Sequence, residues 1–348
     1  MSTAVQKATS IVQGYSGRPL RIMEVCGTHT HEIFRLGIRN MLPDNIRLIS
    51  GPGCPVCVTP TGYIDEAVTL ALDKGCTICT FGDLVRVPGS RLSLAQARAK
   101  GAKIVMVYSP LDSVTYAKEH PEEQVVWLSV GFETTTPASC VAVHQAKELG
   151  LNNYAQLTAN KYMDNAYLAL KDSADAFLYP GHVSVLTGTQ IYKDLRDNLG
   201  ISGVVTGFTG PEILTALAFC IRGIESGEPF FKNCYPRVVT EEGSVSGRKI
   251  IAETMNSVDS EWRGIGVIPN SGLELNETYE EFDARKKFGI PHMEGHANPG
   301  CRCGDILRGD CSPVDCPLYG KACTPEHPVG ACMVSSEGTC SAFYKYNF

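Results

Sequence analysis

The sequence predicts an α/β protein with mainly parallel sheets, followed by a small cysteine-rich C-terminal unit. Between Arg21 and about Gly210, short β-branched runs alternate with helical patterns, which is typical of parallel sheets covered by helices. After about Phe282 the chain changes to glycine, proline, cysteine and short polar residues, which disfavour long helices and strands. At 348 residues and 43% hydrophobic content, the chain is long enough for two or three domains.

Eight short apolar runs are the expected strands. They cover residues 21–26, 46–50, 77–81, 103–109, 125–130, 154–159, 176–180 and 203–208. Amphipathic stretches lie between these runs, and several close on a glycine, which suits the end of a helix. The expected helices include residues 65–75, 93–101, 137–150 and 211–227.

Eight strands are many for one open sheet, so we expect two successive Rossmann-like α/β domains with mainly parallel sheets. The first covers residues 1–120 and the second residues 121–282, with a boundary near Ala117–Gln124. A small Cys-rich iron-sulfur domain covers residues 283–348. A unit of this composition needs an internal cross-link to stabilise its fold, and a metal cluster would provide one.

Charge and composition exclude several classes of partner. The formal net charge of −6 gives no general electrostatic reason to expect nucleic acid or an anionic membrane as a partner. No signal peptide is recognisable, and no stretch reaches the roughly 18 apolar residues of a spanning helix. Phosphate-binding and dinucleotide-binding glycine motifs are also missing. We therefore expect a cytoplasmic protein that is not built around a nucleotide.

The chain contains 15 cysteines. A reducing cytosol keeps thiols free, so metal, cluster or redox chemistry explains them better than a framework of disulfides. Seven of them fall in the C-terminal unit: Cys301, Cys303, Cys311, Cys316, Cys323, Cys332 and Cys340.

Polar and glycine-rich motifs follow the expected strands. The motif "CGTHTH" follows the first strand, "GPGCPVC" the second, "GFETTTP" the fifth and "PGHVS" the seventh. In folds of this class the reactive groups sit at the carboxyl ends of the strands. We expect these loops to converge on one cleft.

Cys54 and Cys57 form a C-x-x-C pair with Pro55 between them. This spacing lets two sulfurs reach one metal or each other, and two thiols alone do not complete a tetrahedral metal site. Cys26, at the end of the preceding strand, is the expected third sulfur, and His29 is a candidate ligand or proton carrier. The alternative is a tight turn with two buried cysteines, which the flanking glycines and prolines make less favourable.

Cys76 and Cys79 have the same spacing but lie inside an apolar strand. Residues three apart in a strand point to opposite faces, so these two sulfurs would diverge. Core packing is therefore the better interpretation, and it also applies to Cys140 and Cys220, which lie in helical patterns.

Glu133 and His182 are the remaining candidates at strand ends. Glu133 lies in a glycine-rich turn before an expected helix, where the neighbouring threonines also suit a helix N-cap. His182 could bind a metal or move protons, although a lone histidine is more often structural.

The cysteine-rich tail predicts a 4Fe-4S cluster. Such clusters use four thiolates from irregular loops, whereas zinc sites usually come as two C-x-x-C pairs, which this tail lacks. The expected ligands have fairly even spacings and are Cys316, Cys323, Cys332 and Cys340. Cys301 and Cys303 remain redox thiols beside the cluster or alternative ligands.

Taken in order, these motifs resemble the hydrogenase maturation factor HypD family. The resemblance runs through "EVCGTHTHEIFRLGI", "GPGCPVCVTP", "TFGDLVRVPGS", "VGFETTTP", "PGHVSVLTG" and "VVTGF" to the cysteine-rich tail. It therefore covers nearly the whole chain, and a series of ordered motifs is far more specific than a single C-x-x-C.

The resemblance implies a role in building the iron centre of nickel-iron hydrogenase, which carries two cyanides and one carbon monoxide. It implies a scaffold complex with a HypC-type chaperone, cyanide delivered by a HypE-type partner, and transfer of the iron to the hydrogenase large subunit. It also implies a 4Fe-4S centre with surroundings similar to those of ferredoxin:thioredoxin reductase.

Carried over residue by residue, the family's iron-associated cysteines fall on Cys26, Cys54 and Cys57, and its histidine falls on His29. Soft thiolates suit an iron that carries cyanide and carbon monoxide. We expect Cys26 to be the direct iron ligand and Cys54 with Cys57 to be a redox pair. We expect His29, Glu133 and His182 to handle protons.

Three hypotheses follow for the function. The first is a redox-active assembly scaffold, which is more a maturation factor than a turnover enzyme. The second is a cluster-dependent thiol-disulfide oxidoreductase that acts through Cys54 and Cys57. The third is a structural role, in which the tail metal gives stability and the cleft docks a partner.

Overall fold

The computed structural model describes residues 3–346 and contains two β-sheets. The first sheet has the strand order β2-β1-β7-β8-β9, and all its strands are parallel. Its strands are β1 (Leu20–Glu24), β2 (Ile46–Ser50), β7 (Ala176–Pro180), β8 (Gly203–Thr206) and β9 (Phe231–Asn233).

The second sheet has the strand order β10-β11-β6-β5-β3-β4. Its strands β3 to β6 are parallel, whereas β10 and β11 form an antiparallel hairpin that pairs with β6. The strands are β3 (Thr77–Thr80), β4 (Ile104–Met106), β5 (Val125–Gly131), β6 (Tyr154–Lys161), β10 (Met255–Trp262) and β11 (Gly266–Leu275). The α/β class with mainly parallel sheets is confirmed.

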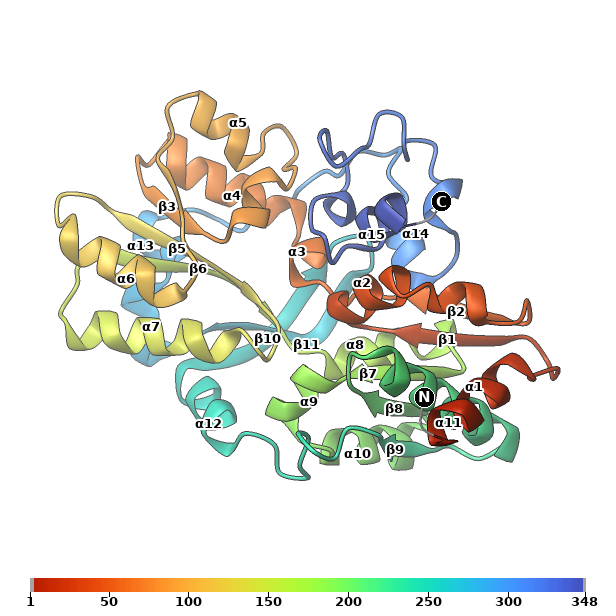
Figure 1. The fold of residues 1–348 in the computed structure, drawn as a ribbon. Helices are drawn as coiled ribbons and strands as arrows, with labels where there is room; N and C mark the ends of the chain where they lie inside the picture. Colours follow the sequence, from red (N-terminus) through yellow and green to blue (C-terminus); the bar gives the residue numbers. More distant parts are fainter. Residues whose placement is uncertain (1–2, 347–348) are drawn as a thin grey trace.

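Helices cover both sheets (Figure 1). Those that follow strands of the first sheet, or precede it, are α1 (Thr3–Gln13), α2 (Gly27–Arg35), α3 (Pro55–Val58), α9 (Gly181–Thr187), α10 (Gln190–Leu199), α11 (Gly210–Ser226) and α12 (Val245–Thr254). Those that precede or follow strands of the second sheet are α4 (Thr61–Leu72), α5 (Leu94–Ala99), α6 (Pro110–Glu119), α7 (Thr136–Glu148), α8 (Asp164–Ala169) and α13 (Ala284–Phe288). Glycines end several of them: Gly75, Gly101, Gly150 and Gly227 all have positive φ, as expected for helix ends.

The cysteine-rich tail contains the short helices α14 (Cys303–Arg308) and α15 (Thr339–Tyr346), with irregular loops between them. It packs against α2, α3 and β2, so it lies beside the first sheet near the junction of the two sheets (Figure 1). None of the helices within residues 3–346 is long and apolar enough to cross a membrane.

The sheets do not follow the expected division of the chain at about residue 120. That boundary falls between β4 and β5, which belong to one sheet, whereas β1 and β2 share the other sheet with β7 to β9. The chain therefore leaves the first sheet after β2, builds most of the second, and returns at β7. The alternation of strand and helix patterns in the sequence predicts where the strands lie, but it does not indicate which strands pair with each other. For this reason the domain boundary predicted from the sequence was wrong.

All eight expected strands are present, and three further strands were missed. β9 has only three residues, and the hairpin of β10 and β11 contains many polar residues because much of it is exposed. The expectation for Cys76 and Cys79 is confirmed: both are buried, and they join hydrophobic clusters with different members. Cys140 in α7 and Cys220 in α11 are also fully buried.

Candidate functional site

Cys26 lies directly after β1, where it is the N-cap residue of α2. Its side chain is buried, and burial raises the pKa of its thiol well above the usual range. Its backbone N–H donates to Oε2 of Glu24 at 3.2 Å, and the Thr30 hydroxyl donates to Oε1 of Glu24 at 2.5 Å. Glu24 was not among the predicted site residues, although a carboxyl group inside the apolar strand "LRIME" indicates that it makes specific polar contacts.

The loop "GPGCPVC" lies against Cys26 because β1 and β2 are adjacent and parallel. The backbone N–H of Gly27 donates to the carbonyl of Gly53 at 3.0 Å. A Cβ atom at Gly53 would lie 2.0 Å from the backbone nitrogen of Cys26, so only glycine fits there. The two thiol-bearing loops are therefore held together through their backbones.

Cys54 is the N-cap residue of the one-turn helix α3, and Pro55 follows at its first position. Cys57 lies within this helix, and both side chains are buried. A hydrogen bond from Cys332 lowers the pKa of Cys57, but the contact with Cys54 and burial outweigh it, so the pKa is raised. Thus a thiol of the tail reaches the C-x-x-C pair.

His182, from α9 after β7, lies beside Cys26. The distances from Sγ of Cys26 to its Nδ1 and Nε2 are 3.8 and 3.9 Å. The ring of Phe208 lies 5.2 Å from that of His182 and 4.7 Å from that of His29. Burial lowers the pKa of His182, so its imidazole is biased toward the neutral form that can accept a proton.

His29 is fully buried in α2, and its Nε2 lies 2.8 Å from the carbonyl oxygen of Gly207. Its Nδ1 is buried without a hydrogen-bond partner. Burial lowers the pKa of His29 to about 4, so its ring is neutral at neutral pH. The structure therefore places His29 between the thiol loop and the loop after β8.

Glu133 follows β5 of the second sheet, and β5 contacts α3, the helix that carries Cys57. It is buried, its Oε1 accepts a hydrogen bond from the backbone N–H of Met163 at 2.8 Å, and its Oε2 has no partner. Burial raises its pKa to about 7. Within the described residues its carboxyl group makes no hydrogen bond to Cys26, Cys57 or His182.

The thiols of the tail continue from the C-x-x-C pair as a row. The thiols of Cys57 and Cys332, of Cys332 and Cys303, and of Cys303 and Cys301 lie close enough to shift one another's pKa, and Sγ of Cys57 lies 3.8 Å from the carbonyl oxygen of Ala331, next to Cys332. We call Cys54, Cys57, Cys332, Cys303 and Cys301 the thiol row. Burial and the neighbouring thiols raise the pKa of these last three cysteines.

Cys340 lies within electrostatic reach of four other tail thiols, which are Cys301, Cys303, Cys316 and Cys323. Cys323 accepts a hydrogen bond from the backbone N–H of Val329 at 3.4 Å. Cys311 is only partly buried and lies near Arg302. The tail thus gathers four thiols around Cys340, five with Cys340 itself, and leaves Cys311 toward the outside.

Two further contacts hold the tail on the thiol loops. The hydroxyl of Thr28 donates to Oε1 of Glu337 at 2.9 Å, next to Cys26. Arg86, in the loop after β3, donates to the carbonyl oxygens of Pro325 and Val334 at 3.0 and 3.1 Å. Both sheets therefore position the tail.

The tip of the β10–β11 hairpin inserts between α3 and the tail. The backbone N–H of Arg263 donates to the carbonyl of Val58 at 2.9 Å, and its Nη1 donates to the carbonyl of Pro88 at 3.0 Å. Its buried guanidinium lowers the pKa values of Cys301 and Cys303, although their net shifts remain upward. Arg263 is a functional candidate that the sequence did not reveal, because the hairpin itself was missed.

Within residues 3–346, no three His, Cys, Asp or Glu side chains converge so that they could hold a single metal ion. Cys26 in particular does not form such a group with Cys54 and Cys57. A 4Fe-4S cluster makes a different demand, because each of its four thiolates binds a different iron and the sulfurs need not meet at one point. The five buried or partly buried thiols of Cys340 and its four neighbours fit this demand in their number and chemistry.

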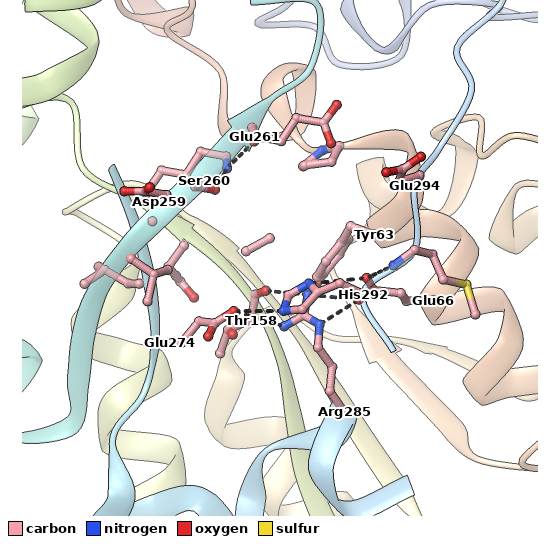
Figure 2. A pocket seen from close by; sticks show the side chains of 18 residues that line it. Tyr63, Glu66, Thr158, Asp259, Ser260, Glu261, Glu274, Arg285, His292 and Glu294 are labelled. Atoms are coloured by element: carbon pink, nitrogen blue, oxygen red, sulfur yellow. Dashed lines mark hydrogen bonds and ion pairs between the residues drawn. The ribbon is translucent and has the colours of Figure 1, made fainter. Parts of the chain in front are cut away.

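A separate polar cavity of about 350 Å³ lies on the second sheet and contains none of the predicted site residues (Figure 2). Arg285 and the buried Glu66 form an ion pair of 2.9 Å there, and His292 lies 3.4 Å from Glu274. Lys161 is buried in its wall, and burial lowers the pKa of Lys161 to about 7. The Glu66–Arg285 and Glu274–His292 pairs join α4 and β11 to α13 and to the segment leading to the tail, so they make this cavity a polar junction.

The fold and the site define a thiol-rich α/β protein in which a C-x-x-C pair is joined to a cysteine-rich tail. Comparison with known proteins then gives the particular family. The HypD family model, described as "Hydrogenase formation hypA family", matches residues 2–347, and the chain belongs to this family of hydrogenase maturation factors.

Similar proteins come from distant organisms. The hydrogenase maturation factor HypD of Azotobacter vinelandii is 41% identical over 99% of this chain and 94% of its own length. The HypD of Escherichia coli is 42% identical over 94% of this chain and 90% of its own length. A putative hydrogenase expression/formation protein of Methanocaldococcus jannaschii is 42% identical over 94% of this chain and 92% of its own length.

Proposed function

We propose that this chain is a scaffold and electron relay for an iron centre that carries two cyanides and one carbon monoxide. The observation that carries the proposal is the thiol row, which joins the C-x-x-C pair to the thiols around Cys340. The proposed partners are a HypC-type chaperone, a HypE-type cyanide donor and, through them, the hydrogenase large subunit.

For the cluster, we propose the ligands Cys301, Cys316, Cys323 and Cys340. Three of these agree with the expected set. Cys301 replaces Cys332, because the Cys332 thiol is already engaged with Cys57 and Cys303. When bound, a 4Fe-4S cluster would supply single electrons at the tail end of the row.

Thiol-disulfide exchange can pass two electrons along the row. When Cys54 and Cys57 are joined as a disulfide, the Cys332 thiolate attacks the sulfur of Cys57 and releases Cys54 as a thiolate. Cys303 then attacks Cys332, which releases Cys57 and leaves a Cys303–Cys332 disulfide. Two protons end on Cys54 and Cys57, so the pair is reduced and the tail pair is oxidised. Arg263 favours the attacking thiolate of Cys303 because it lowers the pKa of that thiol.

Iron is the cargo of this site, and Cys26 is proposed as its direct ligand. A thiolate donates electron density to a low-spin ferrous ion that carries cyanide and carbon monoxide. His182 lies within 3.8 Å of Cys26 and can accept the proton that the thiol must lose on binding. Since Cys26 does not converge with Cys54 and Cys57, the remaining positions on the iron are left to cyanide, carbon monoxide and a partner.

Infrared spectroscopy of the protein purified with its HypC-type partner tests the proposal. We expect cyanide and carbon monoxide stretching bands, which Cys26→Ala should abolish while Cys76→Ala keeps them. Bands that persist in Cys26→Ala would contradict the role of Cys26 as iron ligand.

The thiol row also favours a second function, a cluster-dependent thiol-disulfide oxidoreductase that acts through Cys54 and Cys57. Both thiols are buried, with exposed fractions of 4% and 1%, and this restricts access for a protein disulfide. Turnover of a small disulfide by the isolated protein would support this function. The scaffold proposal expects no such turnover.

A further inference from the structure

A small cavity of about 90 Å³ lies where β2 meets the tail, and no role has been assigned to it so far. Arg39 and Arg47 line it from the side of the first sheet, and Cys311, Ser312 and Thr339 line it from the tail. None of the residues that line this cavity is acidic. The cavity wall therefore carries two guanidinium groups together with hydroxyl and thiol groups, all of which can donate hydrogen bonds.

The guanidinium of Arg39 is fixed in this wall. Its Nη2 donates to the Ser50 hydroxyl at 2.8 Å, its Nη1 donates to the Leu48 carbonyl, and its plane lies over the Phe34 ring at 4.5 Å. Its Nε is buried and has no hydrogen-bond partner. A buried N–H without a partner is costly, so Arg39 retains an unused hydrogen-bond donor in addition to its charge.

Arg47 brings a second positive charge within electrostatic reach of Arg39. Neither guanidinium forms an ion pair in the part of the chain that the structure describes, although the charge of the buried Glu24 acts on Arg39 more strongly than that of Arg47. The nearest tail carboxylates are engaged elsewhere. Asp310 pairs with Arg308 at 3.1 Å, and Asp315 accepts from the backbone N–H of Ser312 at 2.7 Å.

We propose that this cavity binds a small inorganic oxyanion of the sulfate or phosphate class. Two guanidiniums that repel each other gain from a shared anion, and arginine hydrogen-bonds tetrahedral oxyanions well. The hydroxyl of Ser312 accepts from the Asp315 backbone in its capping box, so its own hydrogen is free to donate to the anion. A cavity of about 90 Å³ has room for such an ion.

Because the cavity lies between β2 and the tail, an anion bound there would affect the docking of the tail on the first sheet. Ser50 and Thr339 are joined across it by a hydrogen bond of 3.3 Å, and they directly precede the "GPGCPVC" loop and Cys340. An anion that bridges β2 and the tail binds only while the tail is docked on the first sheet. Its binding therefore stabilises the docked state by mass action.

Calorimetric titration of the full-length protein, with its metal content intact, tests the site. Inorganic sulfate and inorganic phosphate are titrated separately while chloride keeps the ionic strength constant. We expect saturable binding by the native chain, and Arg47→Gln weakens it about tenfold because a charged hydrogen-bond donor is lost. Arg47→Lys, which keeps the charge, retains part of the affinity.

Arg196→Gln is the matched control, because Arg196 is a surface arginine paired with Asp197 at 2.7 Å and does not line the cavity. It should bind the anions as the native chain does. Absence of saturable binding by the native chain would overturn the proposal, and so would equal affinities of the native chain and Arg47→Gln. Tighter binding of glycerol phosphate than of inorganic phosphate would overturn the assignment to a free ion. None of these outcomes depends on hydrogenase maturation.

Discussion

Two C-x-x-C pairs in this chain have the same spacing and different surroundings. Cys54 and Cys57 lie in a loop and a one-turn helix at the carboxyl end of β2, where the tail contacts them. Cys76 directly precedes β3 and Cys79 lies within it, and the two side chains pack into different hydrophobic clusters. The comparison teaches that a loop at a strand end can present two thiols to a shared site, whereas a strand turns them away from each other.

The largest expected effect separates the two pairs by function. Cys57→Ser should reduce hydrogenase activity in a complementation assay to the background of a strain without the protein, because a hydroxyl cannot undergo thiol-disulfide exchange. Cys76→Ala should retain the activity and lower the free energy of unfolding by about 1–2 kcal/mol through lost core packing. Equal loss of activity in both variants, with both proteins folded, would break the comparison.

A second prediction addresses the contact that only the functional pair makes. Cys332→Ser should slow the reduction of the Cys54–Cys57 disulfide about tenfold or more, because the attacking sulfur is missing. Alkylation followed by mass spectrometry, after stepwise addition of reductant, measures the reduced fraction. Cys311→Ser is the control, since Cys311 lies outside the thiol row, and an unchanged rate in Cys332→Ser would remove Cys332 from the relay.

The backbone contact between the two thiol loops gives a third prediction. Gly53→Ala should destabilise the protein by about 2–3 kcal/mol, because its Cβ would lie 2.0 Å from the Cys26 nitrogen and the loops must part. Gly82→Ala is the control, since its Cβ would meet only Met106, at 3.8 Å. Thermal unfolding measures both variants, and unfolding midpoints that agree would show that the loops are not held together as described.

The smallest effect concerns the segment that joins the second sheet to the tail. The hydrogen bond with Glu274 raises the pKa of His292, and His292 in turn lowers the pKa of Glu274 (Figure 2). The His292 contribution is therefore fully present below its unfolded pKa and is lost as the pH rises through its raised folded pKa. The Glu274 contribution is present above the unfolded pKa of Glu274 and is lost as the pH falls.

Urea unfolding of the native chain and of His292→Gln measures this effect. The difference in unfolding free energy should be largest at mildly acidic pH and should shrink toward alkaline pH. We expect it to stay below about 1 kcal/mol because His292 is largely exposed to solvent. A difference that grows with rising pH would contradict the assigned direction.

Much of the fold followed from local patterns. The eight expected strands are found because β-branched runs between amphipathic helices are a local signal, and glycines such as Gly227 end helices where the backbone needs positive φ. The hairpin of β10 and β11 was missed because its exposed strands carry polar residues. With the hairpin, the role of Arg263 was missed as well.

The sequence by itself determined the residue types that chemistry needs, namely Cys26, Cys54 and Cys57 at strand ends and a tail rich in thiols. Only the tertiary structure decided which of them meet. It placed His182 beside Cys26 and Cys332 beside Cys57, and it brought β5 of the second sheet, which precedes Glu133, against α3. The physical reason is that strand formation depends on neighbours in sequence, whereas strand partners and loop contacts are set by packing between segments far apart in the chain.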